Sequence, residues 1–264
     1  MFNLTPTVRN LLIANILFFL AQSNFLPQIT QLGSLYPLGS PYFKAWQFLT
    51  YMFLHGSWTH LLFNMFGLIS FGPMLEQRWG GTRFLTFWLI CGFGAGVLYE
   101  GTRFYESARM ETARTEFSAH PTGGDFADFF RTYYPDARGY ETLAAALTRN
   151  PNDAVLRQSA VQSVDSLVND VRNSPNGGML GASGALFGVL MAFAYLFPNT
   201  KLIIFPLPIP LAAKYVIFGY AALELFQGIH RVPGDNVAHF AHLGGLLIGF
   251  VVLKIWERTS PDFY

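Results

Sequence analysis

Charged residues are scarce in this sequence. Lys, Arg, Asp and Glu make up 12% of its 264 residues, hydrophobic residues make up 52%, and the net charge is +1. A soluble domain of ordinary composition carries about 25% charged residues. A net charge so close to zero gives no reason to expect a nucleic-acid partner. The composition therefore predicts a membrane protein.

Cysteine is also nearly missing, since Cys91 is the single one and lies within an apolar run. An intrachain disulfide is thereby excluded. The sequence shows no cleavable signal peptide: the first apolar run, which follows Arg9, lacks a cleavage site of small residues and is interpreted as a retained span. Aromatic residues are abundant instead, at 17%. Rings in such numbers are typical of membrane helices, where they fill interfaces and anchor at headgroups.

Six apolar segments are candidates for membrane spans, each of which takes about 20 residues. They contain serine, asparagine and histidine, which lipid does not solvate, so these helices are expected to pack together in one bundle. The expected spans are residues 8–22, 58–76, 82–101, 179–197, 211–228 and 236–256.

Most of the charge lies between the third and fourth spans. Residues 101–178 hold eight of the 17 Lys and Arg and ten of the 16 Asp and Glu. The patterns ETLAAALTRN and AVLRQSAVQSVDSLVNDVRN are typical of helices, and Asp153 suits the start of the second. We expect three parts: membrane helices one to three in residues 1–100, a soluble helical insertion in residues 101–178, and membrane helices four to six in residues 179–264.

Lysine and arginine near the ends of the spans predict the orientation of the chain. In a six-span arrangement the basic residues of the tails and of two short connections fall on one side, and this side is expected to be cytoplasmic. The insertion then faces outward. The short connections and the lack of targeting signals favour a bacterial inner membrane. The basic residues on the cytoplasmic side are Arg9, Arg78, Arg83, Lys201, Lys254 and Arg258.

Polar side chains from the second, fourth and sixth spans are predicted at similar depth. They come from the stretches HGSWTHLLFN, GASG and NVAHFAHLGG. His60 and Asn64 are four residues apart, so they share one helix face about 6 Å apart along the axis. Ser183 and His242 join them from the other two spans. Polar residues inside a membrane are candidates for a functional site.

This set of side chains contains the parts needed for acyl transfer. Serine becomes a nucleophile when a base such as imidazole takes its proton, and an asparagine amide or a neutral histidine N–H can hold the oxyanion. Gly181 and Gly184 flank Ser183 and leave room for a substrate backbone. The spacing of Gly245 and Gly249 lets the fourth and sixth spans approach closely.

Each of these features also has a simpler explanation. Small residues four apart usually pack helices together, and a lone serine in a membrane helix usually bonds to its own backbone. His60 and Asn64 could join two helices. The histidines could form a metal site, which is disfavoured because no carboxylate or cysteine joins them; its members would be His55, His60, His239 and His242. If these residues do not form a catalytic site, all of the simpler explanations would have to hold at once.

The motifs resemble those of the rhomboid family of intramembrane serine proteases. HGSWTHLLFN at 55–64, GASGALFG at 181–188 and AHLGG at 241–245 occur in the family's order on the second, fourth and sixth spans, and LEQRWG at 75–80 also matches. The resemblance covers everything outside the insertion. It implies an all-α membrane protein, a rhomboid-like bundle of six membrane helices with the soluble insertion between helices three and four.

The resemblance also implies roles for individual residues. Ser183 would be the nucleophile and His242, rather than His239, the general base, in a catalytic dyad without an acidic third member. His60 and Asn64 would lie in the oxyanion hole. No cofactor or metal is implied. The expected partners are the lipid bilayer and single-pass or polytopic membrane proteins as substrates, cut at small residues near a helix-destabilising sequence.

Further positions are assigned supporting roles or depart from the family pattern. Phe187 stands where some members have tyrosine, so stacking on the catalytic histidine is expected without the hydroxyl. Gly181, Gly184 and His239 are expected to support the site. Gln47 follows Trp46 where the family often has arginine, so that salt bridging in the first outer loop is expected to differ. The fifth span and the HRVPGDN that follows it are expected to gate substrate entry.

Two other functions are compatible with the sequence. A rhomboid-fold protein could bind membrane clients without cutting them, but such relatives typically lose the serine or the histidine, and this chain keeps both. A transporter with a histidine proton relay would place polar residues through the whole bilayer, whereas these gather in the outer half. The insertion has three open roles: substrate recruitment, a partner site, or a tolerated addition.

Overall fold

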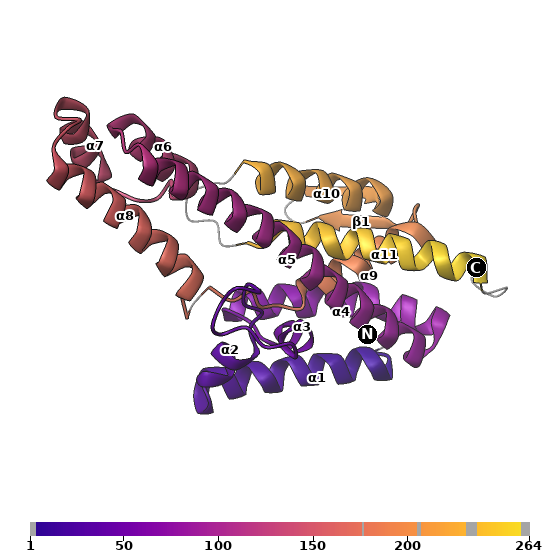
Figure 1. Cartoon of the computed structure of the whole chain (residues 1–264). Coiled ribbons are helices and arrows are strands. Elements are labelled where there is room, and N and C mark those ends of the chain that lie inside the picture. The colour runs from indigo at the N-terminus through magenta and orange to yellow at the C-terminus, as the bar shows by residue number, and fades with distance from the viewer. Residues whose placement is uncertain (1–3, 176, 205–206, 231–236, 260–264) are drawn as a thin grey trace.

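The computed structural model describes residues 4–175, 177–204, 207–230 and 237–259, and it is mostly helical (Figure 1). Each of the six segments expected to be a span contains a helix. In the described part of the chain, two helices, α5 and α11, are long and apolar enough to cross a membrane, and α9 is a shorter apolar helix. The six are α1 (Pro6–Leu20), α4 (Trp58–Trp79), α5 (Gly81–Ala119), α9 (Ser183–Leu196), α10 (Ala213–Ile229) and α11 (His239–Thr259).

A compact loop of short elements connects α1 to α4. It contains a π-helix (Ala21–Phe25), α2 (Gln28–Gly33), α3 (Gln47–Thr50) and a 3₁₀ turn (Tyr51–Phe53). Gln47, at the position where the resemblance led us to expect arginine, is fully buried. Its amide donates to the carbonyl of Tyr42 at 2.9 Å and accepts from the N–H of Lys44 at 3.0 Å. Amide hydrogen bonds to the backbone thus hold this loop.

The expectation of an all-α protein is wrong in one place, between α9 and α10. Strands β1 (Lys201–Ile204) and β2 (Leu207–Ala212) form an antiparallel hairpin in which Lys201 pairs with Ala212. Pro208 and Pro210 explain the difference, because proline lacks the N–H that a helix interior requires and is tolerated in an edge strand. The fifth span, expected from residue 211, therefore begins as a helix at Ala213.

The third span does not end where its apolar stretch ends. Helix α5 continues without a break from Gly81 to Ala119, 39 residues, or about 58 Å at 1.5 Å per residue. Its second half packs with α6 (Gly123–Tyr133) and α8 (Ala154–Asn173), and α7 (Tyr140–Arg149) packs against these two helices. The Asp153 carboxylate accepts from the N–H groups of Val155 and Leu156, so α8 begins where the sequence predicted.

Two separate hydrophobic cores follow from this arrangement. One lies among the six apolar helices, and the other lies within the unit formed by the end of α5 and helices α6, α7 and α8. The start of α1 and the end of α11 lie toward one end of the molecule and α6 and α7 toward the opposite end (Figure 1). Tyr195 near the end of α9 donates to Glu257 near the end of α11, so the start of α9 lies at the opposite end of the bundle from the end of α11.

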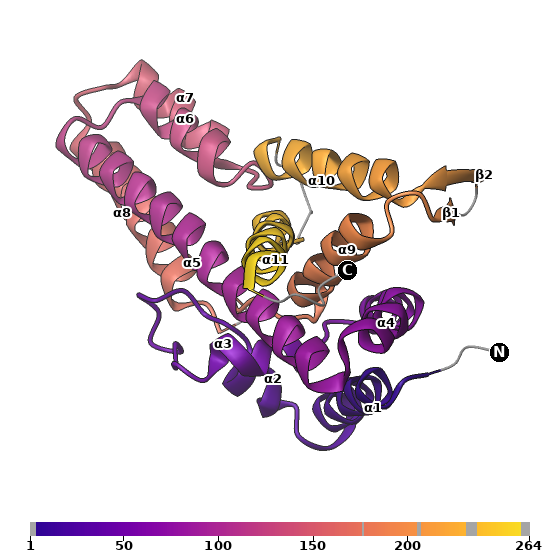
Figure 2. The ribbon, with the colours of Figure 1, turned by 90° about the vertical axis from the view of Figure 1, so that its right-hand side faces the viewer.

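Helix α9 occupies the centre of the bundle and is buried along nearly its whole length. Figure 2 shows it between α4, α10 and α11. Glycines let the backbones of α9 and α11 touch: a Cβ on Gly245 would lie 1.9 Å from the carbonyl oxygen of Gly184, and one on Gly249 would lie 2.9 Å from the Cα of Gly188. Neither contact is compatible with a side chain, so the glycines set the distance between the two helices.

Candidate active site

Ser183 is the first residue of α9, and the backbone before it is held in place from two sides. Met179 pairs with Leu35 through two backbone hydrogen bonds of 2.8 Å, and the N–H of Gly181 donates to the carbonyl of Tyr51 at 2.9 Å. Gly181 has a φ of +131°, which favours glycine over any other residue. The chain thus turns sharply into the helix, and Ser183 is presented at its N-terminus.

The start of a helix also supplies hydrogen-bond donors. The first N–H groups of α9, that of Ser183 included, have no carbonyl one turn earlier within the helix to bond. These N–H groups point out of the N-terminus of the helix. The helix dipole is positive at this end, so a negative charge placed there is stabilised. A developing oxyanion beside Ser183 would therefore meet backbone donors.

His242 lies against Ser183 from helix α11. Its Nε2 is 2.8 Å from the Ser183 Oγ, which is hydrogen-bond distance. The side chain of His242 is 11% exposed. The contact is possible because the glycines of α9 and α11 bring the two backbones together at this level. A serine and an imidazole within hydrogen-bond reach are the arrangement expected of an activated nucleophile and its base.

An aromatic ring fixes the plane of the imidazole. The Phe187 ring lies one turn after Ser183 on α9 and stacks on His242, with ring centroids 4.3 Å apart and an interplanar angle of 7°. The ring of Tyr220, on α10, also packs against Phe187, with ring centroids 5.1 Å apart. The imidazole of His242 is therefore restrained by a ring on its face as well as by hydrogen bonds at its edge.

His60 and Asn64 approach the same place from α4. The His60 ring lies close to Gly181, since a Cβ on that glycine would be 2.8 Å from both Cε1 and Nε2 of His60. The Gly56 N–H donates to His60 Nδ1 at 3.4 Å, which leaves Nε2 as the nitrogen that can carry a proton toward Gly181. The side-chain nitrogen of Asn64 is buried and has no hydrogen-bond partner among the described residues.

Glu224 of α10 is the polar group that the sequence interpretation missed. The resemblance implied no acidic third member, yet the Oε2 of Glu224 lies 2.9 Å from the Nδ1 of His242 and 2.7 Å from the Nδ1 of His239. The residue is 2% exposed. The signal was present in the sequence, because Glu224 is the one acidic residue in the apolar stretch 211–228, and an acidic residue inside a membrane is a candidate functional residue.

The same three side chains are the one group in the described part of the chain that could hold a metal ion. Glu224, His239 and His242 offer ligand atoms within 4.8 Å of one another. The reason given against a metal site, that no carboxylate joins the histidines, is therefore wrong. The site of four histidines is not formed, because His55 and His60 belong to no such group. Both contacts to Glu224 are nevertheless ordinary hydrogen-bond distances made to a single carboxylate oxygen.

Comparison with known protein families gives a match to the description "Rhomboid domain". The matched residues are 42–108 and 156–258, more than half of the chain. They include every predicted site residue on α4, α9 and α11 and also Glu224 on α10. Residues 109–155, which form most of the charged insertion, are not matched.

Three relatives illustrate the similarity. An uncharacterized mitochondrial rhomboid protein of Schizosaccharomyces pombe is 27% identical over 82% of this chain and 53% of its own length. Mitochondrial Rhomboid protein 1 of Saccharomyces cerevisiae is 42% identical over 30% of this chain and 22% of its own. Chloroplastic Rhomboid-like protein 11 of Arabidopsis thaliana is 34% identical over 33% and 30%. The chain thus spans about half or less of these relatives.

Proposed function

The chain belongs to the rhomboid family, and we propose that it is an intramembrane serine endopeptidase that hydrolyses peptide bonds in or near transmembrane segments of membrane proteins. The observation that carries the proposal is the 2.8 Å contact between the Ser183 Oγ and the His242 Nε2, made inside a bundle of apolar helices. A serine with a base at this distance is the minimal equipment for covalent peptide hydrolysis.

We propose that all six apolar helices lie in the membrane. Helices α1, α9 and α10 have 15, 14 and 17 residues, which is shorter than a span exposed to lipid requires. A helix buried in a bundle is shielded from lipid, and α9 is the helix that is most completely surrounded. The bundle would place the site on the side of the insertion, away from the termini, and the termini in the cytoplasm.

Ser183 and His242 would carry the chemistry. The Ser183 Oγ attacks the carbonyl carbon of the scissile bond while its proton moves to the Nε2 of His242, giving a tetrahedral intermediate. When the C–N bond breaks, the imidazolium returns the proton to the leaving amine, and an acyl-enzyme remains. Water then repeats the sequence with His242 as base and releases the carboxylic acid and Ser183.

His60, Asn64 and the N–H of Ser183 would stabilise the oxyanion. Among the described residues the side-chain nitrogen of Asn64 has no hydrogen-bond partner, and the Nε2 of His60 is the ring nitrogen that faces Gly181, so both are available as donors. Donors that are fixed before the reaction stabilise the charge as it develops without a reorganisation cost. Gly181 leaves the space beside the nucleophile into which a substrate backbone fits, because a side chain there would collide with His60.

Substitution of the serine tests the proposal. Ser183→Ala should abolish cleavage of a model membrane substrate by the purified full chain and abolish labelling by a fluorophosphonate probe. Ser70→Ala is the matched control, since Ser70 also lies in an apolar helix, α4, but not at the site; it should keep both activities. Cleavage by Ser183→Ala at the wild-type rate would refute the proposal. Binding of the substrate by a wild type that does not cut it would favour a client-binding protein.

A further inference from the structure

We propose that Glu224 is a positioning residue for the general base, so that the site works as a relay of Ser183, His242 and Glu224. The proposal rests on the proposed protease function and adds to the serine–histidine pair a third member from α10. The Glu224 Oε2 contacts the Nδ1 of His242, the nitrogen opposite the one that faces Ser183. One line of contacts thus runs from α10 through α11 to α9.

The two contacts to Glu224 determine where the protons are. A single oxygen, Oε2, faces two ring nitrogens, the Nδ1 of His239 and the Nδ1 of His242. A carboxylic acid would donate its O–H to one ring nitrogen and accept only weakly at that oxygen from the other, whereas an ionised carboxylate accepts from both N–H groups in two charge-assisted hydrogen bonds, which are stronger. We infer from this that His242 carries its proton on Nδ1 and that its Nε2 lone pair faces the Ser183 hydroxyl. This is the tautomer that a general base needs.

The carboxylate also acts during proton transfer. When the Ser183 O–H bond breaks and the Oγ–carbon bond forms, the proton goes to the Nε2 of His242, and the ring becomes a cation. Glu224 takes no proton; its negative charge lies 2.9 Å from the ring nitrogen and offsets the new positive charge. Such compensation is strongest where water is scarce, and Glu224 is 2% exposed.

His239 gives this carboxylate a second anchor. His239 and His242 are three residues apart on α11, so both rings project toward α10. Their two N–H groups hold one oxygen of Glu224 between them, which restricts the rotation of the carboxylate. His239 would thus support the site through Glu224 rather than through contact with substrate.

A metal ion at these three side chains would have a different consequence. It would occupy the Nδ1 of His242 as a ligand, and this nitrogen would then carry no proton. Any remaining ring proton would sit on Nε2 and face Ser183 as a donor, so that the base would be lost. The relay and a metal site are therefore exclusive alternatives, and they can be separated by experiment.

The first test compares Glu224→Gln with Glu224→Asp in the full-length protein in detergent, with EDTA present. Glu224→Gln keeps the shape but removes the charge and offers an N–H donor that permits the wrong tautomer. Its kcat should fall by about 10² or more with KM within about threefold of wild type. Glu224→Asp keeps the charge and should retain at least about tenfold more kcat than Glu224→Gln. Equal losses in the two variants, or full kcat in Glu224→Gln, would overturn the proposal. So would activity that EDTA removes and zinc restores.

The second test does not depend on activity, so it separates this proposal from the proposed function. Nitrogen NMR of protein labelled at histidine reports which ring nitrogen carries the proton, and His242→Gln identifies the signal. Wild type should show His242 protonated on Nδ1, and Glu224→Gln should show a mixture or the other tautomer. An Nε2-protonated His242 in the wild type would overturn the relay even if cleavage is observed. Ser183→Ala, which tests the protease function alone, should leave the protonation of Nδ1 unchanged.

Discussion

The bundle of apolar helices and the insertion are both helical, but they are held together in opposite ways. In the bundle, α9 and α11 meet backbone to backbone at glycines. In the insertion, the helices are kept apart by a filled core of side chains, among which Phe126 and Leu147 are 1% and 0% exposed. Charged groups cover the insertion on its outer faces, whereas the bundle presents apolar residues there.

The difference shows which region can tolerate change. A backbone contact has no flexible side chain that could move aside, so the distance between Ser183 and His242 depends on glycines that cannot be replaced. A side-chain core loses stability when it is truncated, but neighbouring rings can adjust. We therefore expect changes in the bundle to abolish the function and changes in the insertion to alter stability locally. The following substitutions test this, from the largest expected effect to the smallest.

The largest effect is expected from Gly245→Ala. The added Cβ would lie 1.9 Å from the carbonyl oxygen of Gly184, so α9 and α11 must separate and the contact between Ser183 and His242 must lengthen. Cleavage should fall by at least about 10² because catalysis depends on this geometry. Gly101→Ala on α5 is the control, since a Cβ there has nothing within 4 Å; it should be neutral or stabilising by up to about 1 kcal/mol. Similar cleavage activities of the two variants would show that the glycine contact between α9 and α11 does not determine the geometry of the site.

Phe126→Ala should destabilise the insertion alone. Phe126 packs against the rings of Phe117 and Phe130 at 5.8 and 4.9 Å between centroids, and its loss should cost about 3–5 kcal/mol locally. Limited trypsin digestion of the full chain should then cut faster within residues 101–178, while substrate cleavage falls less than about tenfold. Val155→Ala, at a side chain 72% exposed, should digest like the wild type. Complete loss of cleavage in Phe126→Ala would show that the two cores are coupled.

An effect confined to catalysis, with the fold intact, is expected from Asn64→Ala. Removal of one oxyanion donor costs about 10² to 10³ in kcat in other enzymes, and the Asn64 amide is buried without a partner among the described residues. Thermal stability should change little, because no hydrogen bond to that amide is lost. Asn15→Ala is the control: its amide donates to the Leu11 carbonyl at 2.7 Å within α1, so its loss should affect stability and leave kcat unchanged. A wild-type kcat in Asn64→Ala would show that Asn64 does not act in the oxyanion hole.

The sequence was sufficient to locate the helices of the bundle, because apolar stretches mark them directly. It was less informative about where helices end. The apolar stretch of the third span stops near residue 101, but α5 continues to Ala119. No proline or glycine occurs between Gly101 and His120, and Pro121 follows. Polarity limits the part of a helix that can lie in lipid, whereas the helix itself ends only at a residue that breaks it.

The candidate site residues that stand in local motifs could be predicted from the sequence. The residue that reaches the site only through packing of distant segments could not. Ser183, His242, His60 and Asn64 stand in short motifs whose residue types indicate acyl transfer. Glu224 stands in no motif, and its contact with His242 depends on how α10 packs against α11. That packing is a property of the tertiary structure, and periodicity within one helix does not predict it. The unusual placement of an acidic residue in an apolar stretch was the only local signal.

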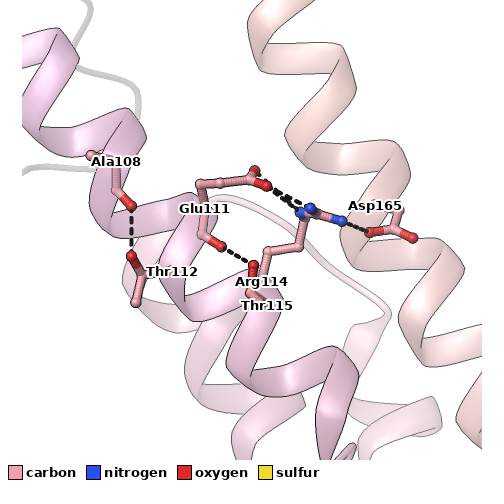
Figure 3. Close-up of polar contacts among 6 residues, drawn as sticks. All are labelled: Ala108, Glu111, Thr112, Arg114, Thr115 and Asp165. Carbon is pink, nitrogen blue, oxygen red and sulfur yellow. Dashed lines mark hydrogen bonds and ion pairs between the residues drawn. The ribbon is translucent and has the colours of Figure 1, made fainter.

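The smallest effect is expected on the surface of the insertion, where an ion-pair cluster joins α5 to α8. The Arg114 guanidinium lies 2.8 Å from Asp165 and donates to both oxygens of Glu111 at 3.1 Å (Figure 3). The hydrogen bond from Arg114 lowers the pKa of Glu111. The side chains of Arg114, Glu111 and Asp165 are 31%, 53% and 39% exposed, so solvent screening limits the contribution to about 1 kcal/mol or less.

Substitution of Arg114 by methionine should therefore lower the thermal midpoint of the full chain in detergent only slightly at pH 7. Because the folded-state pKa of Glu111 is lowered, its contribution is present above the unfolded value of about 4.3 and is lost as pH falls through the folded value. The difference between Arg114→Met and wild type should shrink below about pH 4 and in high salt. Arg131→Met is the control, since its pair with Asp128 is exposed and lies within one helix. A loss of stability of several kcal/mol in Arg114→Met that does not change with pH would mean that buried charge stabilises the insertion. The proposed difference between the insertion and the bundle would then be wrong.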